Sequence, residues 1–382
     1  MVVQTPEGIL EVRNATIRAN RLEANSFRFD SNLHLTSNLE VGTANLFVDT
    51  TTSNVGIGTN LPLVRFDVNG DIQTNNRIFN SGFGMIIPLV QSKNMRVVQA
   101  YAGSDVSFTV PSGVTRIYAK LWGGGGCGGR KQGWNYAAPG GGGGFTHGVI
   151  TTIPGETLTL IVGAGGKMTG GVAYGGGGFA TAPNYSGSGG GRSAIRRGGT
   201  ELVTAGGGGG GSATRSASYG GKGNRGGAGG GLQGQNGTAA YDGRWNYAGA
   251  GGGQSSDEFV VLSYGGIVPA SYGNAYGSQF QGGSTTPDHG GSGGGGWYGG
   301  GAGQYVESNT MGGGGGGSGY VGGCLFGKTM AGRWTEPGNI EDVDYVPGIA
   351  YGGQGWNGSD YPTSETDIAN HVGGDGLMVI YY

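Results

Sequence analysis

The chemistry most directly suggested by this sequence of 382 residues is phosphate binding. Gly322–Thr329 reads GGCLFGKT and satisfies the spacing G-x-x-x-x-G-K-T, in which loop amides and a lysine hold the phosphates of a nucleotide. Such a loop needs a buried strand before it and a helix after it. Here the glycine run Gly312–Gly317 precedes the match, and Pro337 follows it closely. In a sequence so rich in glycine we interpret the match as a coincidence, and we predict no cofactor.

Other candidates for catalysis or metal binding are scattered along the chain. The histidines have no ligand spacing; they are His34, His147, His289 and His371. The acidic segment Glu341–Asp344 has two interpretations, a calcium site or, more simply, a solvated run of charge. Cys127 and Cys324 lie beside glycine runs, and we expect free thiols there. Because no nucleophile motif is present either, we predict no catalytic residue, no metal site and no enzyme.

Aromatic residues form a more informative pattern. The segments GWNYAAPGGG, from Gly133, and RWNYAGAGGG, from Arg244, are near-copies that place a Trp and a Tyr just before a glycine run. Trp334 and Trp356 occupy comparable loop settings. Such rings either cap a glycine block that has no side chains of its own, or they stack on sugars and anchor a partner. The candidate receptor-binding residues are Trp134, Tyr136, Trp245, Tyr247, Trp297 and Tyr298.

Glycine dominates the composition. It occupies 95 positions, about a quarter of the chain, against a usual share of about 7%. Residues 1–100 hold only seven of these glycines, so we place a domain boundary near residue 100. Collagen is excluded because the glycines are consecutive and only 12 prolines occur. A disordered linker is the alternative, but strand-like segments such as Thr115–Trp122 interrupt the runs.

Charge and hydropathy exclude further classes of protein. A net charge of −2 and 12% charged residues argue against general binding to nucleic acid or to a membrane surface. No apolar stretch approaches the roughly 20 residues that span a bilayer. Met1–Leu10 lacks the basic start and apolar core of a signal peptide. We therefore expect synthesis in a cytosol.

Residues 1–50 predict a repetitive β stalk. Pairs of apolar residues two positions apart recur every five to seven residues with asparagines between them, as in Leu33/Leu35, Leu39/Val41 and Leu46/Val48. Such pairs indicate short strands with one apolar face, joined at corners, as in a β-prism or β-solenoid. One chain buries too little, so we predict a homotrimer. An amphipathic helix is the alternative for the first 25 residues, and residues 51–98 read as a turn-rich connector.

Residues 99–382 predict an antiparallel β-sandwich, which makes the chain all-β. Pro154–Glu156 favours a hairpin between residues 145–153 and 157–162, and Gly198-Gly199 favours a second between 194–197 and 200–204. The first and last strands, near residues 97–100 and 376–382, are expected side by side. The glycine runs are expected to leave one end as a packed bundle of polyglycine II helices.

Two groups of motifs carry resemblances to known families. The element VGIGT…P…FDVNG, within residues 55–70, resembles fibre-like proteins of large DNA viruses of algae and tail-fibre regions of phages. Three motifs resemble the glycine-rich module of the anaplastic lymphoma kinase receptor family and polyglycine tips of phage tail fibres. They are VTRIYAKLWGGGGCGG, GGGGGFTHGVITTIPGETLTLIVGAGG and GGGRSAIRRGGTELVTAGGGGGG, between residues 114 and 211.

These resemblances imply a structural fibre protein on a virion or cell surface. Its glycine-rich tip would attach to a polysaccharide or wall of the host surface. The expected partners are the chain itself, other virion or fibre proteins and a host glycan, with no nucleic acid and no membrane. A purely architectural protein, associated with a capsid or forming filaments, is the alternative. A polysaccharide-degrading spike would instead need paired carboxylates in a cleft.

Overall fold

The computed structural model of the chain is almost entirely β, with almost no helix. It divides into two compact units, Met1–Asn76 and Arg77–Tyr382, called unit 1 and unit 2 below. The described residues are 39–41, 46–49, 51–57, 66–68, 95–130, 136–168, 171–180, 186–214, 224–239, 248–255, 276–285, 290–306, 310–355 and 369–382.

Unit 1 contains one small sheet with the order β1-β2-β3-β4. Its strands are β1 Leu39–Val41, β2 Leu46–Asp49, β3 Asn54–Ile57 and β4 Phe66–Val68. The first three pair antiparallel, and β4 pairs parallel with β3. Two predicted apolar pairs lie on β1 and β2. The earlier pairs lie outside the described residues, and the divisions expected at residues 50 and 98 stay predictions.

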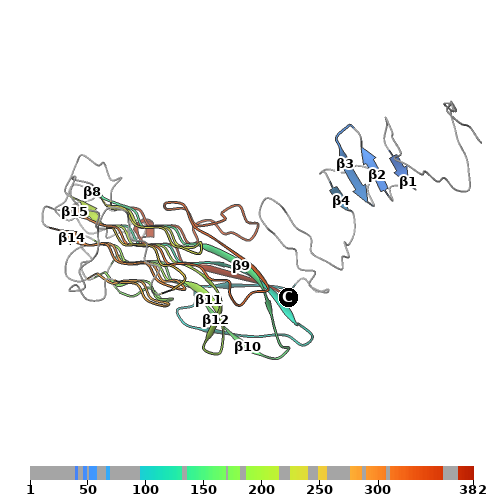
Figure 1. Ribbon diagram of the computed structural model, residues 1–382, viewed down its shortest axis with the longest axis horizontal. Coiled ribbons are helices and arrows are strands. Elements are labelled where there is room, and N and C mark those ends of the chain that lie inside the picture. The colour runs from blue at the N-terminus through green and yellow to red at the C-terminus, as the bar shows by residue number, and fades with distance from the viewer. Residues whose placement is uncertain are drawn as a thin grey trace, which may run out of the picture. The chain divides into compact units, whose positions relative to one another are not determined.

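Unit 2 is built around two antiparallel sheets in a sandwich-like arrangement (Figure 1). The first sheet has the order β16-β9-β7-β17-β5, with β5 Arg96–Ala100, β7 Arg116–Trp122, β9 Phe145–Thr151, β16 Phe326–Met330 and β17 Leu377–Tyr381. The second has the order β12-β11-β10-β6, with β6 Val106–Thr109, β10 Thr157–Ile161, β11 Ser193–Arg197 and β12 Thr200–Ala205. Two short pairs lie outside these sheets. They are β8 Tyr136–Ala137 with β13 Ala213–Thr214, and β14 Tyr305–Val306 with β15 Thr310–Met311.

Two of the expected strand pairings are confirmed and one is wrong. β17, the last strand, pairs with β5, and β11 forms a hairpin with β12 through Gly198 at a φ of 58°. The expected hairpin of β9 with β10 does not form, because the two strands belong to different sheets. Ile150 of β9 and Leu158 of β10 both enter the core, and they can do so only from opposite sides. The Pro-Gly turn therefore carries the chain from one sheet to the other.

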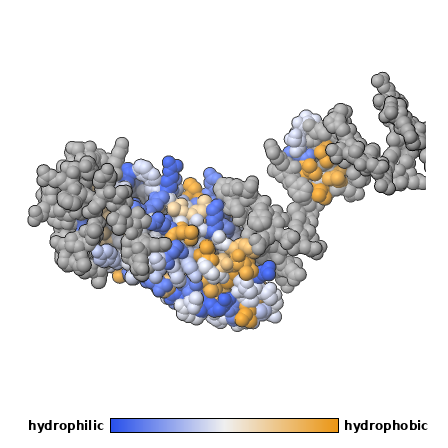
Figure 2. Space-filling view, in the orientation of Figure 1, coloured by the Kyte–Doolittle hydropathy of each residue, from blue (hydrophilic) through white to orange (hydrophobic). Residues whose placement is uncertain are grey.

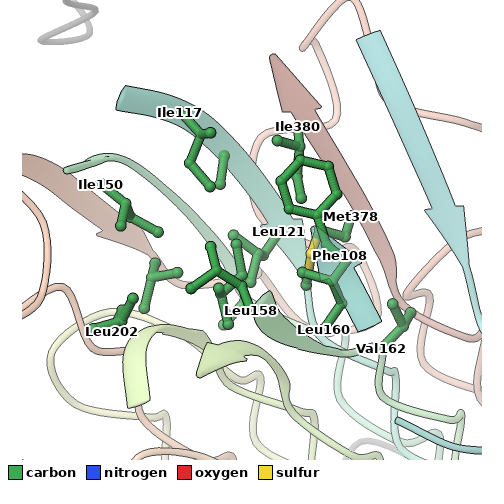
Figure 3. Close-up of a cluster of buried hydrophobic side chains, with 14 of the residues drawn as sticks. Phe108, Ile117, Leu121, Ile150, Leu158, Leu160, Val162, Leu202, Met378 and Ile380 are labelled. Atoms are coloured by element: carbon green, nitrogen blue, oxygen red, sulfur yellow. The ribbon is translucent and has the colours of Figure 1, made fainter. Parts of the chain in front are cut away.

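The core lies between the two sheets. Alternate residues of β7, such as Ile117 and Leu121, face Leu158 and Leu160 of β10, with Met378 of β17 beside them (Figure 3). All are buried, and each such side chain contributes roughly 1.5–3 kcal/mol by leaving water. This core is what the period-two pattern of these strands produces.

A second, smaller apolar cluster covers part of the outer face of the five-stranded sheet. Trp122 and Phe145 pack there with their ring centroids 4.8 Å apart. Ala350 and Tyr345, from the segment after β16, lie over them. The Trp122 Nε1–H donates a 3.0 Å hydrogen bond to the Gly338 carbonyl, which fixes that segment to the sheet.

The glycine runs leave the sandwich directly from its strands. β7 ends at Trp122 and continues as Gly123, and β12 ends at Ala205 and continues as Gly206. In Figure 1 these extended segments run side by side away from β10 towards β8, β14 and β15. We call this set of extended segments the glycine array.

Hydrogen bonds in the array follow a three-residue period. Along Gly206–Gly211, successive amides donate to three neighbouring segments in turn. The pairs, donor first, are Gly207 to Gly295, Gly208 to Gly124, Gly209 to Gly227, Gly210 to Ser292 and Gly211 to Cys127. The carbonyls accept from three further segments, in the pairs Gly144 to Gly206, Gly317 to Gly207, Gly190 to Gly208, Gly141 to Gly209, Gly314 to Gly210 and Gly187 to Gly211. The run therefore has six bonded neighbours.

Close backbone approach explains why glycine is required. A Cβ added at Gly209 would lie closer than 3.0 Å to the carbonyl group of Gly314. One added at Gly314 would meet the carbonyl group of Ser292 in the same way. Real Cβ atoms do not approach backbone so closely, and backbone bonded on both sides cannot move aside. The inside of the array is therefore mostly main chain, with small buried side chains such as those of Cys127, Ala228 and Ser292 among the glycines.

Candidate functional site

The structure describes half of the predicted receptor-binding residues. Trp134, Trp245 and Tyr247 lie outside the described residues. Tyr136 belongs to β8, which Figure 1 places at the end of unit 2 away from β10. Trp297 and Tyr298 directly follow the run Gly293–Gly296, as the remaining members of the set. The structure brings these last two together, with their ring centroids 6.2 Å apart.

Trp297 is held by aromatic packing on one face and along its edge. Its ring stacks on Tyr320, with centroids 3.9 Å apart and an interplanar angle of 11°. Phe280 meets it edge-on at 5.6 Å, and its Nε1–H donates to the Gln254 carbonyl at 3.2 Å. Stacking and edge contacts of this kind stabilise a fold beyond the area that they bury. Trp297 therefore has a packing role at the border of the glycine array.

Tyr298 is also half-buried and is fixed mainly through its backbone. Its amide donates to Ser318 Oγ at 3.0 Å, and its carbonyl accepts from the Ser318 amide at 3.0 Å. The same Ser318 hydroxyl donates to the Gly253 carbonyl at 2.6 Å, so one side chain links three segments. Contact of Tyr298 with a receptor stays a prediction.

The segment with the phosphate-binding spacing has a different geometry from such a loop. Gly322 and Gly323 lie in a turn, and the chain then enters β16, so a strand stands where the motif needs a helix. Lys328 is exposed on this strand and lies directly across from His147 of β9. The lysine therefore projects from a sheet face instead of facing a helix N-terminus.

A shallow cavity of about 330 Å³ lies beside Lys328 on the outer face of the five-stranded sheet. It is lined by Tyr118, His147, Val149, Leu325, Phe326, Gly327 and Lys328. Figure 2 shows apolar residues gathered over the part of unit 2 where Figure 1 labels β9. Burial lowers the pKa of His147 to about 4, helped by the charges of Lys120 and Lys328. Burial also raises the pKa of Tyr118 to about 12, so both rings are neutral near pH 7.

The acidic segment Glu341–Asp344 was expected to be a solvated run of charge, and this expectation is wrong. Two of its carboxylates belong to an ion-pair network. Lys120, buried on the central strand β7, bonds Asp342 Oδ1 at 2.7 Å and Asp344 Oδ2 at 2.8 Å. Asp344 also accepts from Arg96 at 2.9 Å and from the Tyr381 hydroxyl at 2.6 Å. Burial opposes ionisation of Asp344, but these bonds from Lys120, Tyr381 and Arg96 outweigh it and hold its pKa below the usual range. The carboxylates that suggested calcium binding thus neutralise a buried lysine.

A second charged cluster had no signal in the sequence. Glu201, fully buried on β12, pairs with Arg192 at 2.7 Å and with Arg196 at 3.0 Å. Both guanidinium groups also lie over the ring of Phe280, with Cζ at 4.6 and 4.9 Å from its centroid. Burial lowers the pKa of Arg192. This cluster joins the four-stranded sheet to the array segment that carries Phe280 and has a structural role.

The structure also describes the cysteines, the possible metal ligands and Trp334. Cys127 and Cys324 are both free, and burial raises the pKa of each thiol, that of Cys324 to about 12. Within the described ranges, no group of three His, Cys, Asp or Glu side chains could hold a metal ion. No helix of the described part is long and apolar enough to span a bilayer. Trp334, treated in the sequence only as one more loop aromatic, has a side chain that is 60% exposed.

Comparison with known proteins identifies the family. The model of the family described as a glycine-rich domain matches residues 101–323. This range begins just before β6, and it contains the whole four-stranded sheet, strands β7 and β9 of the five-stranded sheet, and most of the glycine runs. No curated protein matches the chain. Since the matched range is more than half of the sequence, the chain belongs to the glycine-rich domain family.

Proposed function

We propose that this chain is a structural fibre protein of a virion or cell surface, and that its glycine-rich unit attaches to a polysaccharide or wall of a host surface. The observation that carries the proposal is the glycine array, whose six-neighbour hydrogen bonding needs no side chains. A block of this kind has no pocket inside it, so its use lies in holding the loops at its end in fixed positions. Membership of the glycine-rich domain family supports the assignment.

The proposal includes a specific conformation for the array. A three-residue period with bonds to six neighbours is what a packed bundle of polyglycine II helices would produce. Ordering each glycine costs roughly 1–2 kcal/mol of chain entropy, while one hydrogen bond contributes about 1 kcal/mol net. Only a lattice in which nearly every amide and carbonyl is paired can offset that cost. We infer that the array forms cooperatively and is rigid once formed.

For unit 1 we propose a homotrimeric stalk, as a β-prism or β-solenoid. The sheet β1-β2-β3-β4 has strands of only three or four residues, too short for a stable sheet by itself. Its outer strands, β1 and β4, each pair on one side only within the described residues. Closure of three chains around an axis would pair these edges and bury the apolar pairs.

The remaining parts of the proposal concern partners and location. The partners are further copies of this chain, other virion or fibre proteins and a host glycan, with no nucleic acid and no membrane. The chain is made in the cytosol and then carried on a virion surface or extracellular fibre. It catalyses no reaction.

The test uses the full chain. Its mass in solution is measured by light scattering, and its binding is measured on a glycan array and on intact cells with glycan-rich walls. We expect a mass near three times the chain mass of 38.3 kDa and binding to at least one class of polysaccharide. A monomer refutes the stalk assignment, and absence of binding to every glycan and wall refutes attachment.

The architectural alternative has an observation in its favour. Trp297 is stacked on Tyr320, and Tyr298 is fixed by Ser318, so two candidate receptor contacts already have packing roles. Electron microscopy separates the two functions. Discrete pegs with a bulb at one end favour attachment, whereas end-to-end polymers favour a filament with no receptor.

A further inference from the structure

Trp334 lies at the tip of a very short hairpin on unit 2. The Arg333 amide donates to the Glu336 carbonyl at 2.8 Å, and the Glu336 amide donates back to Arg333 at 3.0 Å. The turn between them therefore has two residues, Trp334 and Thr335. Trp334 adopts a φ of 60°, in the left-handed region.

This backbone conformation is unfavourable for tryptophan. Two-residue hairpin turns place positive φ values at their centre and usually use glycine, asparagine or aspartate there. A bulky residue with a positive φ is an outlier, and such outliers gather at functional sites. The local backbone alone would therefore be better served by glycine.

The attachment of the turn to the array does not need the indole either. The Trp334 carbonyl accepts from the Gly142 amide at 2.7 Å, and the Thr335 carbonyl accepts from the Gly352 amide at 2.8 Å. Both bonds are made by main chain and would be available to any residue. The ring is 60% exposed, so it contributes little to a core. Folding thus accounts for the turn but not for the side chain.

Arg225 covers one face of the indole and leaves the rest of the ring in solvent. Its Cζ lies 4.2 Å from the ring centroid of Trp334, which is a close cation–π contact. The Arg225 Nε is buried and has no hydrogen-bond partner among the described residues, where the cation–π contact with the indole is the one interaction of this guanidinium group. An aromatic ring supported from behind in this way is pre-oriented for a ligand on its other face.

A shallow, open depression of about 320 Å³ lies at this turn, lined by Arg333, Trp334, Thr335 and Glu336. Its open form suits one unit of a long chain that lies across the surface. The four lining residues include an arginine, a threonine and a glutamate next to the tryptophan, and the lining is mostly polar. Charges of both signs favour a neutral ligand that donates and accepts hydrogen bonds.

We propose that Trp334 and this depression bind one hexopyranose unit of a neutral polysaccharide. The polarised C–H groups on one face of the sugar lie on the free indole face, which carries the negative part of the ring quadrupole. The sugar hydroxyls donate to Glu336 and accept from Arg333. This inference rests on the proposed attachment function, and it names the sugar class and the contact residue.

The experiment measures binding of full-length protein to cellohexaose, chitohexaose and β-mannohexaose, with polygalacturonate as the acidic comparison. Titration calorimetry and tryptophan fluorescence are the readouts. The key variants are Trp334→Gly and Trp334→Asn, because both residues accept the positive φ and remove the ring. We expect at least tenfold weaker binding to the neutral probe that the native protein prefers, with a melting temperature equal to or above native. Glu336→Gln should weaken binding severalfold, and Tyr276→Ala, which removes another exposed aromatic side chain, should leave binding unchanged.

The outcomes separate this inference from the function on which it rests. If the native protein binds a neutral probe and both Trp334 variants bind equally well, the Trp334 site is wrong while attachment survives. If it binds only polygalacturonate, the sugar class is wrong. If it binds no probe, no glycan on an array and no cell wall, attachment fails and this inference fails with it.

Discussion

The sandwich and the glycine array of unit 2 are held together in opposite ways. In the sandwich, side chains such as Ile117 and Leu158 fill the space between sheets, which in packed sheets is about 10 Å wide. In the array, backbone lies directly against backbone, and a Cβ at Gly314 would collide with the Ser292 carbonyl group. Buried side chains stabilise the first region, and paired amides stabilise the second.

This difference teaches which changes each region can accept. A side-chain core tolerates volume-conserving apolar exchanges and loses stability in proportion to the atoms removed. At the glycines of the array no smaller residue exists, and the neighbouring backbone leaves no room for a larger one. The chain passes from one kind of packing to the other within a single peptide bond, as between Trp122 and Gly123.

The largest expected effect is therefore a single methyl group inside the array. Gly209→Ala places a Cβ closer than 3.0 Å to the Gly314 carbonyl group, in a run bonded to six neighbours. We expect a loss of more than about 4 kcal/mol or no folded protein, a size reserved for severe packing defects. Urea denaturation followed by circular dichroism measures it. Gly199→Ala is the matched control, since nothing lies within 4 Å of its Cβ, and an equal loss in both variants would contradict the close-packed array.

The second prediction tests the buried charges that fasten the outer face of the sandwich. Lys120→Met leaves Asp342 and Asp344 without their buried cation. Breaking a buried pair by removing one partner costs about 3–5 kcal/mol, and the remaining contacts of Asp344 with Arg96 and Tyr381 favour the lower part of that range. The same denaturation experiment is used. Lys328→Met, an exposed lysine on β16, should change stability by less than about 0.5 kcal/mol.

The third prediction shows the graded response of a side-chain core. Leu158→Ala should cost about 3 kcal/mol through lost burial and a residual cavity, whereas Leu158→Met should cost less than about 1.5 kcal/mol. Both variants are compared with native protein by urea denaturation. If Leu158→Met were as damaging as Leu158→Ala, the contrast between the two regions would lose its basis.

The last expected effect, no larger than the third, is a pH dependence that belongs to the sandwich alone. His147 has a pKa of about 4 in the fold, against about 6.5 in an unfolded chain, so the unfolded chain binds its proton first as the pH falls. Stability from His147 is complete above pH 6.5 and is lost between pH 6.5 and 4, by on the order of 3 kcal/mol. The His147→Gln variant should lack this loss. Asp344, whose pKa is depressed, adds a loss at lower pH in both proteins, so identical profiles down to pH 4 would contradict the assignment.

The sequence was sufficient for the strands of the two sheets other than β16, and for a glycine-rich region that leaves one end of them. Alternating apolar residues predicted β7 and β17, and the glycine pair predicted the β11–β12 hairpin, because these signals are local. The same kind of signal misled at Pro154–Glu156, since a turn motif specifies a reversal but not which sheet the next strand joins. The sheet that β9 or β10 joins depends on the core, which Ile150 and Leu158 enter from opposite sides.

Contacts between residues far apart in the chain could not be predicted from local sequence patterns. Lys120 and Asp342 are 222 positions apart, and nothing near either residue indicates the other. The neighbours of each glycine run could not be assigned because runs without side chains are chemically alike. Trp334 could not be selected as a binding residue from the sequence, because its exposure and its φ of 60° are properties of the folded turn.

The period of the array also imposes a counting rule on how such genes can change in length. Deleting one codon from Gly206–Gly211 would shift every later amide by one step of the three-residue period and aim it at a different neighbour. Deleting three codons would restore the original hydrogen-bond partners along a shorter glycine run. Insertions between the glycine runs do not change this aim, so the connecting segments can vary freely in length. The glycine runs themselves can shorten or lengthen only by three residues at a time.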